Sequence, residues 1–189
     1  MFIVDLGLDL AKFYKFDSES GLFNNTRKRD IEISKGVGAR HMLVHPDSDY
    51  VFIFSEMSAE VFSFRKNGEK TDFIEVIPSL PDDHAGIPSG AAICMHPNGR
   101  FLYVSNRSNN SITIIQFDKE SEKLSVVGYE QTGGISPRDF NIDPDGKWLL
   151  AANQDSDNII VFSINQSNGL LEKIHVNKDI KTPTCIKFY

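Results

Sequence analysis

The sequence predicts an all-β protein built from about four tandem copies of a four-stranded antiparallel unit, and three observations support this fold class. One turn motif occurs three times, in the segments HPDSDYVFIFSE (45–56), HPNGRFLYVSNR (96–107) and DPDGKWLLAANQ (143–154). The prolines of these motifs are 51 and 47 residues apart, and FIVDLG near the N-terminus matches the motif one period upstream. Each copy continues with further alternating runs in one fixed order. Four short strands with a period of about fifty residues are typical of a propeller blade, so we expect residues 1–189 to form a single, incomplete β-propeller domain.

Each unit contains four expected strands. The innermost strand is an apolar run before the turn, and its copies are RHMLVHP (40–46), GAAICMHP (90–97), RDFNIDP (138–144) and CIKFY (185–189). The second strand follows the turn, which lies at about Ser48 in the first of these copies. The third-strand runs are AKFYKFD (11–17), EVFSFRK (60–66), SITIIQFD (111–118) and NIIVFSIN (158–165), and the fourth-strand runs are RDIEIS (29–34), FIEVIPSL (73–80), LSVVGYEQT (124–132) and EKIHVN (172–177). Their β-branched and aromatic residues alternate with polar ones, as in antiparallel strands. A plain antiparallel sandwich would explain these strands but not their fixed period.

Composition narrows the class of protein further. The chain is 40% hydrophobic and 24% charged, within the globular range, and its net charge of −6 argues against nucleic acid or an anionic membrane as a partner. Cys94 and Cys185 both lie in apolar runs, which favours reduced thiols and a cytoplasmic location. The N-terminus lacks the features of a signal peptide, and no apolar run is long enough to span a bilayer. We therefore expect a cytoplasmic protein.

Strand geometry places several polar residues at one end of the propeller. Arg40 and Glu56 lie eight residues on either side of the turn at about Ser48, so they should face each other across two paired strands. Because the first strand of a blade is innermost, this end opens on the mouth of the central channel. An isolated cross-strand ion pair is the alternative explanation, and such pairs contribute only about 0.2 to 1 kcal/mol when exposed.

The repeat extends this set to neighbouring blades. Position 40 corresponds to Ala91 and Arg138, and position 56 corresponds to Arg107 and Gln154. Four further residues lie beside these positions, namely His41, Asp139, Asn106 and Asn153. Three arginines at one mouth predict a binding site for a small anion.

Other common kinds of site have no support in the sequence. His45 and His96 occupy the turn on the opposite face, where Asp143 replaces them, and no two histidines have metal-ligand spacing. The glycine and serine motifs of nucleotide-binding proteins and serine hydrolases do not occur. We expect neither a metal nor a cofactor.

Several segments resemble the lactonase family of seven-bladed propellers. They are DLGLD (5–9), G-x-G-x-R-H (36–41), SNR (105–107), PRDFNIDPDGKWLLAANQDSDNIIVF (137–162) and PTCIKF (183–188), in order along the chain. In this family a histidine, two arginines and a glutamate at the mouth are associated with binding and turnover of an acidic lactone, and the resemblance assigns Arg40, Glu56 and Arg107 to this set. Ala39 and Ser55 stand where the family usually has proline and asparagine, and SNRSNNSI replaces a more usual SNRGHDSI, but these changes remove no charged group.

The length of the chain departs from the family pattern. Seven blades need roughly 340 residues at about 49 each, whereas this chain has 189. The family's upstream H-x-H stretch, the source of the site histidine, is therefore expected to lie before Met1. We also expect the open arc to be marginally stable and to have weak or no lactonase activity. Its open blade edges could be covered by self-association, or the MFIVDLG and CIKFY segments could pair and close a smaller ring.

The resemblance implies hydrolysis of a sugar-acid lactone such as 6-phosphogluconolactone, within the pentose phosphate pathway. Arg40 and Arg107 would bind anionic oxygens, and Glu56 or neutral His41 would be the base that activates water. The expected substrate contacts are Arg138, Gln154, Asn106, Asn153 and Asp139. Two alternatives remain open, a non-catalytic propeller that acts as a binding module and an enzyme that lactonises a muconate.

Overall fold

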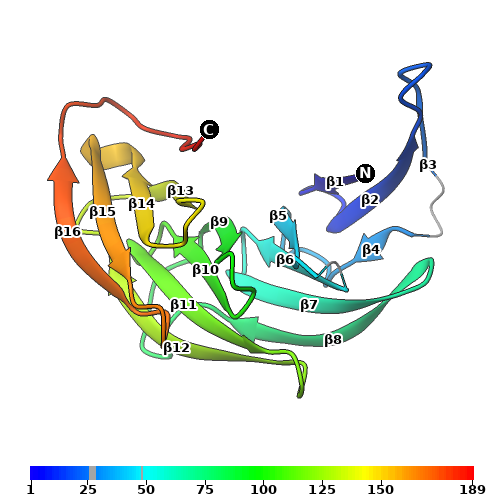
Figure 1. Cartoon of the computed structure of the whole chain (residues 1–189), viewed down its shortest axis with the longest axis horizontal. Helices are drawn as coiled ribbons and strands as arrows, with labels where there is room; N and C mark the ends of the chain where they lie inside the picture. Colours follow the sequence, from blue (N-terminus) through cyan, green and yellow to red (C-terminus); the bar gives the residue numbers. More distant parts are fainter. Residues whose placement is uncertain (26–28, 48) are drawn as a thin grey trace.

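The computed structural model describes residues 1–25, 29–47 and 49–189, and Ser48, at the predicted turn, lies outside them. These residues form four four-stranded antiparallel sheets, which follow one another as propeller blades from the blue N-terminal part to the orange and red C-terminal part (Figure 1). The predicted all-β propeller fold is confirmed. The structure describes one helical turn, η1 (Gln154–Ser156), and no described helix is long and apolar enough to cross a membrane.

Three blades are complete and have their four strands in chain order. The second blade contains β5 (Ala39–Val44), β6 (Tyr50–Ser55), β7 (Glu60–Asn67) and β8 (Lys70–Pro78). The third contains β9 (Gly90–Met95), β10 (Phe101–Asn106), β11 (Ser111–Asp118) and β12 (Lys123–Gln131). The fourth contains β13 (Pro137–Ile142), β14 (Trp148–Asn153), β15 (Asn158–Ile164) and β16 (Leu171–Asn177). Each of these three blades begins with the strand that the sequence placed innermost.

The first blade begins with the second strand of the unit, as the sequence predicts. It contains β1 (Phe2–Asp5), β2 (Leu10–Phe16), β3 (Phe23–Asn25) and β4 (Ile31–Glu32). Both β3 and β4 pair with β2, so the outer strand of this blade is formed in two parts.

The cores lie between neighbouring blades, because each inner blade is buried on both faces. In β6, Phe52 and Phe54 pack with Leu102 of the third blade, whereas Val51 and Ile53 belong to the core shared with the first blade. Side chains alternate between the two faces of a strand, so an almost continuous apolar run is needed when both faces are covered. This packing fixes the position of one blade relative to the next, and with it the residues at the channel mouth.

Two buried histidines connect consecutive blades on the face opposite the mouth. The backbone N–H of Asp47 donates to Nδ1 of His45 (3.1 Å), so Nε2 carries the hydrogen and donates to the carbonyl of Gly99 in the next blade (3.0 Å). His96 repeats this arrangement with the carbonyl of Gly146 at 2.8 Å. In the fourth blade Asp143 occupies the same turn position and accepts a bond from its own blade instead.

The ends of the chain do not pair with each other. The backbone N–H of Ile186 donates to Asp139 (2.8 Å) and its carbonyl accepts from Asn141 (3.0 Å), so the predicted strand 185–189 lies beside β13 and has no assigned strand ladder. Among the described strands, β1 pairs with β2 alone. The N-terminus lies at β1 of the first blade, and the C-terminal segment turns back over the fourth blade (Figure 1). The expected closure into a smaller ring is wrong because the C-terminal segment is held at β13, three blades away. Self-association through the open edges stays a prediction.

The bond between His96 and the carbonyl of Gly146 makes Gly146 sensitive to substitution. Gly146 has a φ of +72°, and a Cβ added there would lie 2.5 Å from Nε2 of His96. Gly68 has a φ of +59° and no atom within 4 Å of the same position. Gly146→Ala and Gly68→Ala should share a backbone cost of about 1 kcal/mol, and Gly146→Ala should lose a further 1 kcal/mol or so with the His96 bond. Urea denaturation measures both, and equal losses would contradict a stabilising role for the bond.

Candidate functional site

Bulges at the start of each complete blade's innermost strand place the residues of the mouth. The pairing of β5 with β6 shifts between Ala39 and His41, and that of β13 with β14 shifts between Pro137 and Asp139. Arg40 and Arg138 are therefore the extra residues of equivalent bulges. An extra residue in a strand is left outside the regular ladder, and its side chain takes a new direction. The backbone of the repeat thus sets the place of both arginines.

Glu56 bridges two of the predicted arginines across the boundary between blades. Its Oε2 accepts from Nε of Arg40 (3.1 Å) and its Oε1 from Nη2 of Arg107 (2.9 Å). The side chains are 13%, 17% and 30% exposed for Arg40, Arg107 and Glu56, so the pairing is shielded and still reachable from solvent. The structure therefore brings together the three residues that the family resemblance assigned to the site.

The innermost strand of the third blade holds both arginines in place. Nη1 of Arg40 donates to the carbonyl of Ala91, and Nη2 of Arg107 donates to the carbonyl of Gly90 (3.0 Å). The N–H of Gly90 donates in turn to the carbonyl of Glu56 (2.8 Å). A Cβ at Gly90 would lie 2.3 Å from the carbonyl oxygen of Ser55. Gly90 is therefore a positioning residue that the sequence analysis did not single out, although it opens the apolar run at 90–97.

A second positioning residue comes from the first blade. The carboxylate of Asp9 accepts the backbone N–H groups of Gly36 (2.8 Å) and Gly38 (2.6 Å), and these bonds lower the pKa of Asp9. The carbonyl of Gly38 accepts the N–H of Glu56 (2.7 Å). Asp9 thus fixes the segment that leads into Arg40. The sequence analysis did not single out Asp9, although the DLGLD and G-x-G motifs contain both sides of this contact.

The two arginines favour the ionised form of Glu56. Burial alone would raise the pKa of Glu56, but the hydrogen bond and charge of Arg107, together with Arg40, outweigh burial and lower this pKa below its ordinary value. The pKa of Arg40 is lowered by burial and then by the nearby charge of Arg107, with Arg138 acting in the same direction. Glu56 raises the pKa of Arg40, so its negative charge partly offsets the positive charges of the neighbouring arginines.

His41 faces Arg40 and is neutral at pH 7. Nη1 of Arg40 lies 3.1 Å from Nε2 and 3.5 Å from Nδ1 of His41, and because a guanidinium only donates, the His41 ring is the acceptor in this contact. Burial lowers the pKa of His41 below 6.5, and the charge of Arg40 lowers it further. At neutral pH, His41 is therefore unprotonated and can accept a proton.

The remaining predicted substrate contacts fall into two groups. Arg138 and Gln154 are half-buried at the mouth of the fourth blade, where the N–H of Gln154 donates to the carbonyl of Ser136 (2.9 Å). Asp139 is also half-buried, but its carboxylate is engaged by the N–H of Ile186. Its contact is with the C-terminal segment of the chain.

Asn106 and Asn153 lie behind the mouth and are fully buried. Nδ2 of Asn106 donates to Thr113 (3.0 Å), and its Oδ1 accepts from the hydroxyl of Ser79 (2.9 Å). Nδ2 of Asn153 donates to Asn158 (2.8 Å). The structure does not bring these two amides to the mouth, because both end a strand with the side chain turned inward to tie neighbouring segments together.

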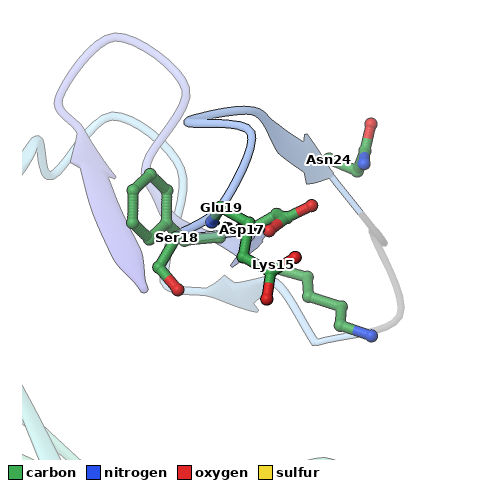
Figure 2. A pocket seen from close by; sticks show the side chains of 6 residues that line it. Lys15, Asp17, Ser18, Glu19 and Asn24 are labelled. Carbon is green, nitrogen blue, oxygen red and sulfur yellow. Dashed lines mark hydrogen bonds between the residues drawn. The ribbon is translucent and has the colours of Figure 1, made fainter.

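Two other kinds of site receive no support from the described residues. No group of three or more His, Cys, Asp or Glu side chains in the described ranges is arranged to hold a metal ion. A hollow of about 460 Å³ lies on the β2–β3 hairpin of the first blade (Figure 2). Its residue Asp17 serves its own turn, accepting from Ser20 (2.8 Å) and from the N–H of Glu19 (3.0 Å), and the labelled side chains spread apart without a common target (Figure 2).

The sequence matches the family described as "Lactonase, 7-bladed beta-propeller" over residues 1–188. The chain belongs to this lactonase family. It is 33% identical to the 6-phosphogluconolactonase of Bacillus subtilis over 187 residues, which are 98% of this chain and 52% of that protein. It is 35% identical to the 6-phosphogluconolactonase of Yersinia pseudotuberculosis over 165 residues, which are 86% of this chain and 49% of that protein.

Solved structures agree with this membership. The lactonase-family chain superposes on the periplasmic gluconolactonase PpgL of Pseudomonas aeruginosa with a TM-score of 0.91 and 25% sequence identity, covering 98% of this chain and 52% of that one. The chain therefore spans about half the length of the curated relatives and of this structural neighbour.

The bridging role of Glu56 predicts a pH-dependent stability. Its folded-state pKa lies below the ordinary value of 4.5, so ionised Glu56 stabilises the folded protein above about pH 4.5, and this contribution is lost as the pH falls through the lower folded-state pKa. Glu56→Gln should lower the free energy of unfolding by about 1 to 2 kcal/mol at pH 7 and by progressively less below pH 4.5.

Urea denaturation between pH 3 and pH 7 measures this difference. Glu19→Gln removes an exposed carboxylate from the far hairpin and serves as the matched control. A deficit in Glu56→Gln that stayed constant down to pH 3 would contradict the charge-based explanation.

Proposed function

We propose that the channel mouth binds an anionic sugar-acid lactone and supports its hydrolysis, as in 6-phosphogluconolactonase. The observation that carries this proposal is the Arg40–Glu56–Arg107 bridge, which fixes two guanidinium groups at the place where a propeller opens to solvent. The names of two relatives, both 6-phosphogluconolactonases, and that of a gluconolactonase neighbour support the choice of a lactone.

The charge at the mouth favours an anionic substrate. Arg40, Arg107 and Arg138 contribute three positive charges, against which Glu56 supplies one negative charge and Asp139 a second that the backbone of Ile186 already engages. The whole chain carries a net charge of −6. A local positive field in an acidic protein attracts small anions without binding polyanions in general.

The arginines are arranged to stabilise charge on an oxygen. Nε of Arg107 is buried and has no partner among the described residues, so this N–H is free to donate to a substrate. Glu56 and the carbonyls of Gly90 and Ala91 hold both guanidinium groups before substrate arrives. Donors fixed in advance stabilise the oxyanion that forms when water attacks a carbonyl.

His41 is better suited than Glu56 to activate water. The lowered pKa of Glu56 makes its carboxylate a weak base, whereas neutral His41 can take a proton at pH 7. In the proposed reaction a water oxygen bonds to the lactone carbonyl carbon, and its proton passes to Nε2 of His41. The carbonyl carbon then releases the ring oxygen, which receives that proton as a hydroxyl group. A substrate oxygen bound to Arg40 would displace His41 from Nη1 and free this lone pair.

We place the reaction in carbohydrate metabolism, at the lactone step of the pentose phosphate pathway, in the cytoplasm. Two free cysteines, Cys94 and Cys185, are consistent with a reducing compartment. The substrate is a small anion, with no nucleic acid or membrane partner.

Removing either arginine should weaken binding of the hydrolysis product. Arg40→Ala and Arg107→Ala should each reduce affinity for 6-phosphogluconate by about 1.5 to 3 kcal/mol, the range for a hydrogen bond to a charged group. Isothermal titration measures the affinity, and circular dichroism confirms that each variant is folded. Arg100→Ala, on the opposite face at the β9–β10 turn, is the control. Unchanged affinity in both mouth variants would assign these arginines to the scaffold.

The assignment of His41 as base predicts the acid limb of the pH–rate profile. Because burial and Arg40 lower the pKa of His41 below 6.5, the rate of 6-phosphogluconolactone hydrolysis should be maximal at pH 7 and fall at a pH below 6.5. His41→Asn should reduce the rate at pH 7 by about 10²- to 10⁴-fold and abolish this limb. The measurement is an assay corrected for spontaneous hydrolysis, and an acid limb that persists in His41→Asn would transfer the role of base to another group.

A further inference from the structure

The fourth blade contains a structural equivalent of the Arg40–Glu56 pair. Arg138 is the extra residue of the bulge between β13 and β14, as Arg40 is between β5 and β6. The N–H of Gln154 donates to the carbonyl of Ser136 (2.9 Å), and the N–H of Glu56 donates in the same way to the carbonyl of Gly38 (2.7 Å). The two backbone frames match, so the chemical difference between the pairs lies in their side chains.

That difference leaves Arg138 without a counter-charge. Gln154 provides an amide where the second blade provides a carboxylate, and the guanidinium of Arg138 makes no ion pair or hydrogen bond with the described residues. The adjacent carboxylate of Asp139 accepts the N–H of Ile186. Arg138 instead lies close enough to Arg40 for the two positive charges to repel. An exposed arginine would be neutralised by solvent, but this one is half-buried beside a second cation.

Unpaired polar atoms lie in the turns that end β10 and β14. Oε1 of Gln154, Oγ of Ser108 and Nε of Arg107 are buried and lack a partner among the residues that the structure describes. Buried polar groups in proteins are normally hydrogen-bonded, so several orphans in adjacent turns indicate a site whose ligand supplies the missing bonds. Two of them, Ser108 and Arg107, can donate to an anion, and Gln154 can accept from a hydroxyl group.

Ser136 joins these turns into one unit. Its N–H donates to Oδ1 of Asn110, in the turn after β10 (2.8 Å), and its carbonyl accepts the N–H of Gln154. Ser136 has a φ of +62°, a strained value for a residue other than glycine. The backbone thus holds the Ser108 turn of the third blade against the Gln154 turn of the fourth, with Arg138 two residues after Ser136.

We infer that Arg138, Gln154 and Ser108 form a second anion subsite at the mouth, which binds the phosphate group at the far end of the substrate. The Arg40–Glu56–Arg107 bridge then serves the lactone carbonyl, and the carbonyl oxygen of Gln154 receives a sugar hydroxyl. This inference rests on the proposed function for the identity of the substrate. The replacement of glutamate by glutamine is its central feature, because a carboxylate at that position would occupy Arg138 and repel a phosphate.

Titration with ligands that differ in one phosphate tests the subsite. The probes are 6-phosphogluconate, gluconate and inorganic phosphate, measured by isothermal titration against the whole chain. Arg138→Gln should weaken binding of 6-phosphogluconate by about ten- to hundredfold and leave gluconate unchanged. Gln154→Glu should produce the same selective loss, because it supplies Arg138 with the counter-charge that Glu56 gives to Arg40. Inorganic phosphate should also lose affinity in both variants, because the proposed contact of Arg138 is with the phosphate group.

Arg100→Gln is the matched control, since it removes one positive charge from an exposed arginine on the opposite face. An equal loss in Arg100→Gln, an equal loss for gluconate, or unchanged affinity for 6-phosphogluconate in Arg138→Gln would overturn the subsite. Urea denaturation confirms that each variant is folded, and the Gln154→Glu variant provides an independent test if Arg138→Gln is unstable. The test does not depend on turnover, so a chain that binds phosphate through Arg138 but hydrolyses no lactone would refute the proposed function and leave the subsite standing.

Discussion

The packing of one flat blade against the next is the constraint on which the rest of this structure depends. Phe52 and Phe54 face the third blade and Val51 and Ile53 face the first, so β6 cannot shift by one residue without moving its apolar side chains to the wrong core. The same packing sets how far the strand ends of adjacent blades stand apart. Residues from different blades, such as Glu56 and Arg107, can therefore meet within hydrogen-bond distance.

At the mouth, the same backbone arrangement recurs from blade to blade, but the side chains differ. Bulges recur where the innermost strands begin, but the bulge residues are Arg40 in the second blade and Arg138 in the fourth, with Ala91 at the corresponding place in the third. The small side chain of Ala91 leaves its carbonyl accessible to Arg40. A symmetric scaffold thus carries an asymmetric arrangement of charge, which is what recognition of an asymmetric ligand needs.

The sequence predicted the blades well because their period and apolar alternation report packing directly. It also placed Arg40, Glu56 and Arg107 together, since counting residues from a shared turn is enough to locate strand ends. Counting did not reveal that Asn106 and Asn153 are buried, because adjacent residues at a strand end point to opposite sides and the local bulge changes which side that is. The contact of residues 185–189 with β13 depends on Asp139 and Asn141, whose partners are distant in the chain.

Gly90 shows where this architecture is least tolerant of change. It has no functional group, yet its N–H holds the backbone of Glu56 and its carbonyl receives Arg107, while the carbonyl of Ser55 leaves no room for a side chain. Exchange of an arginine at the mouth removes the contacts of that side chain, but a side chain at Gly90 would displace the backbone that holds both Glu56 and Arg107. The charged side chains at the mouth can therefore differ from blade to blade, whereas position 90 has room for no side chain at all.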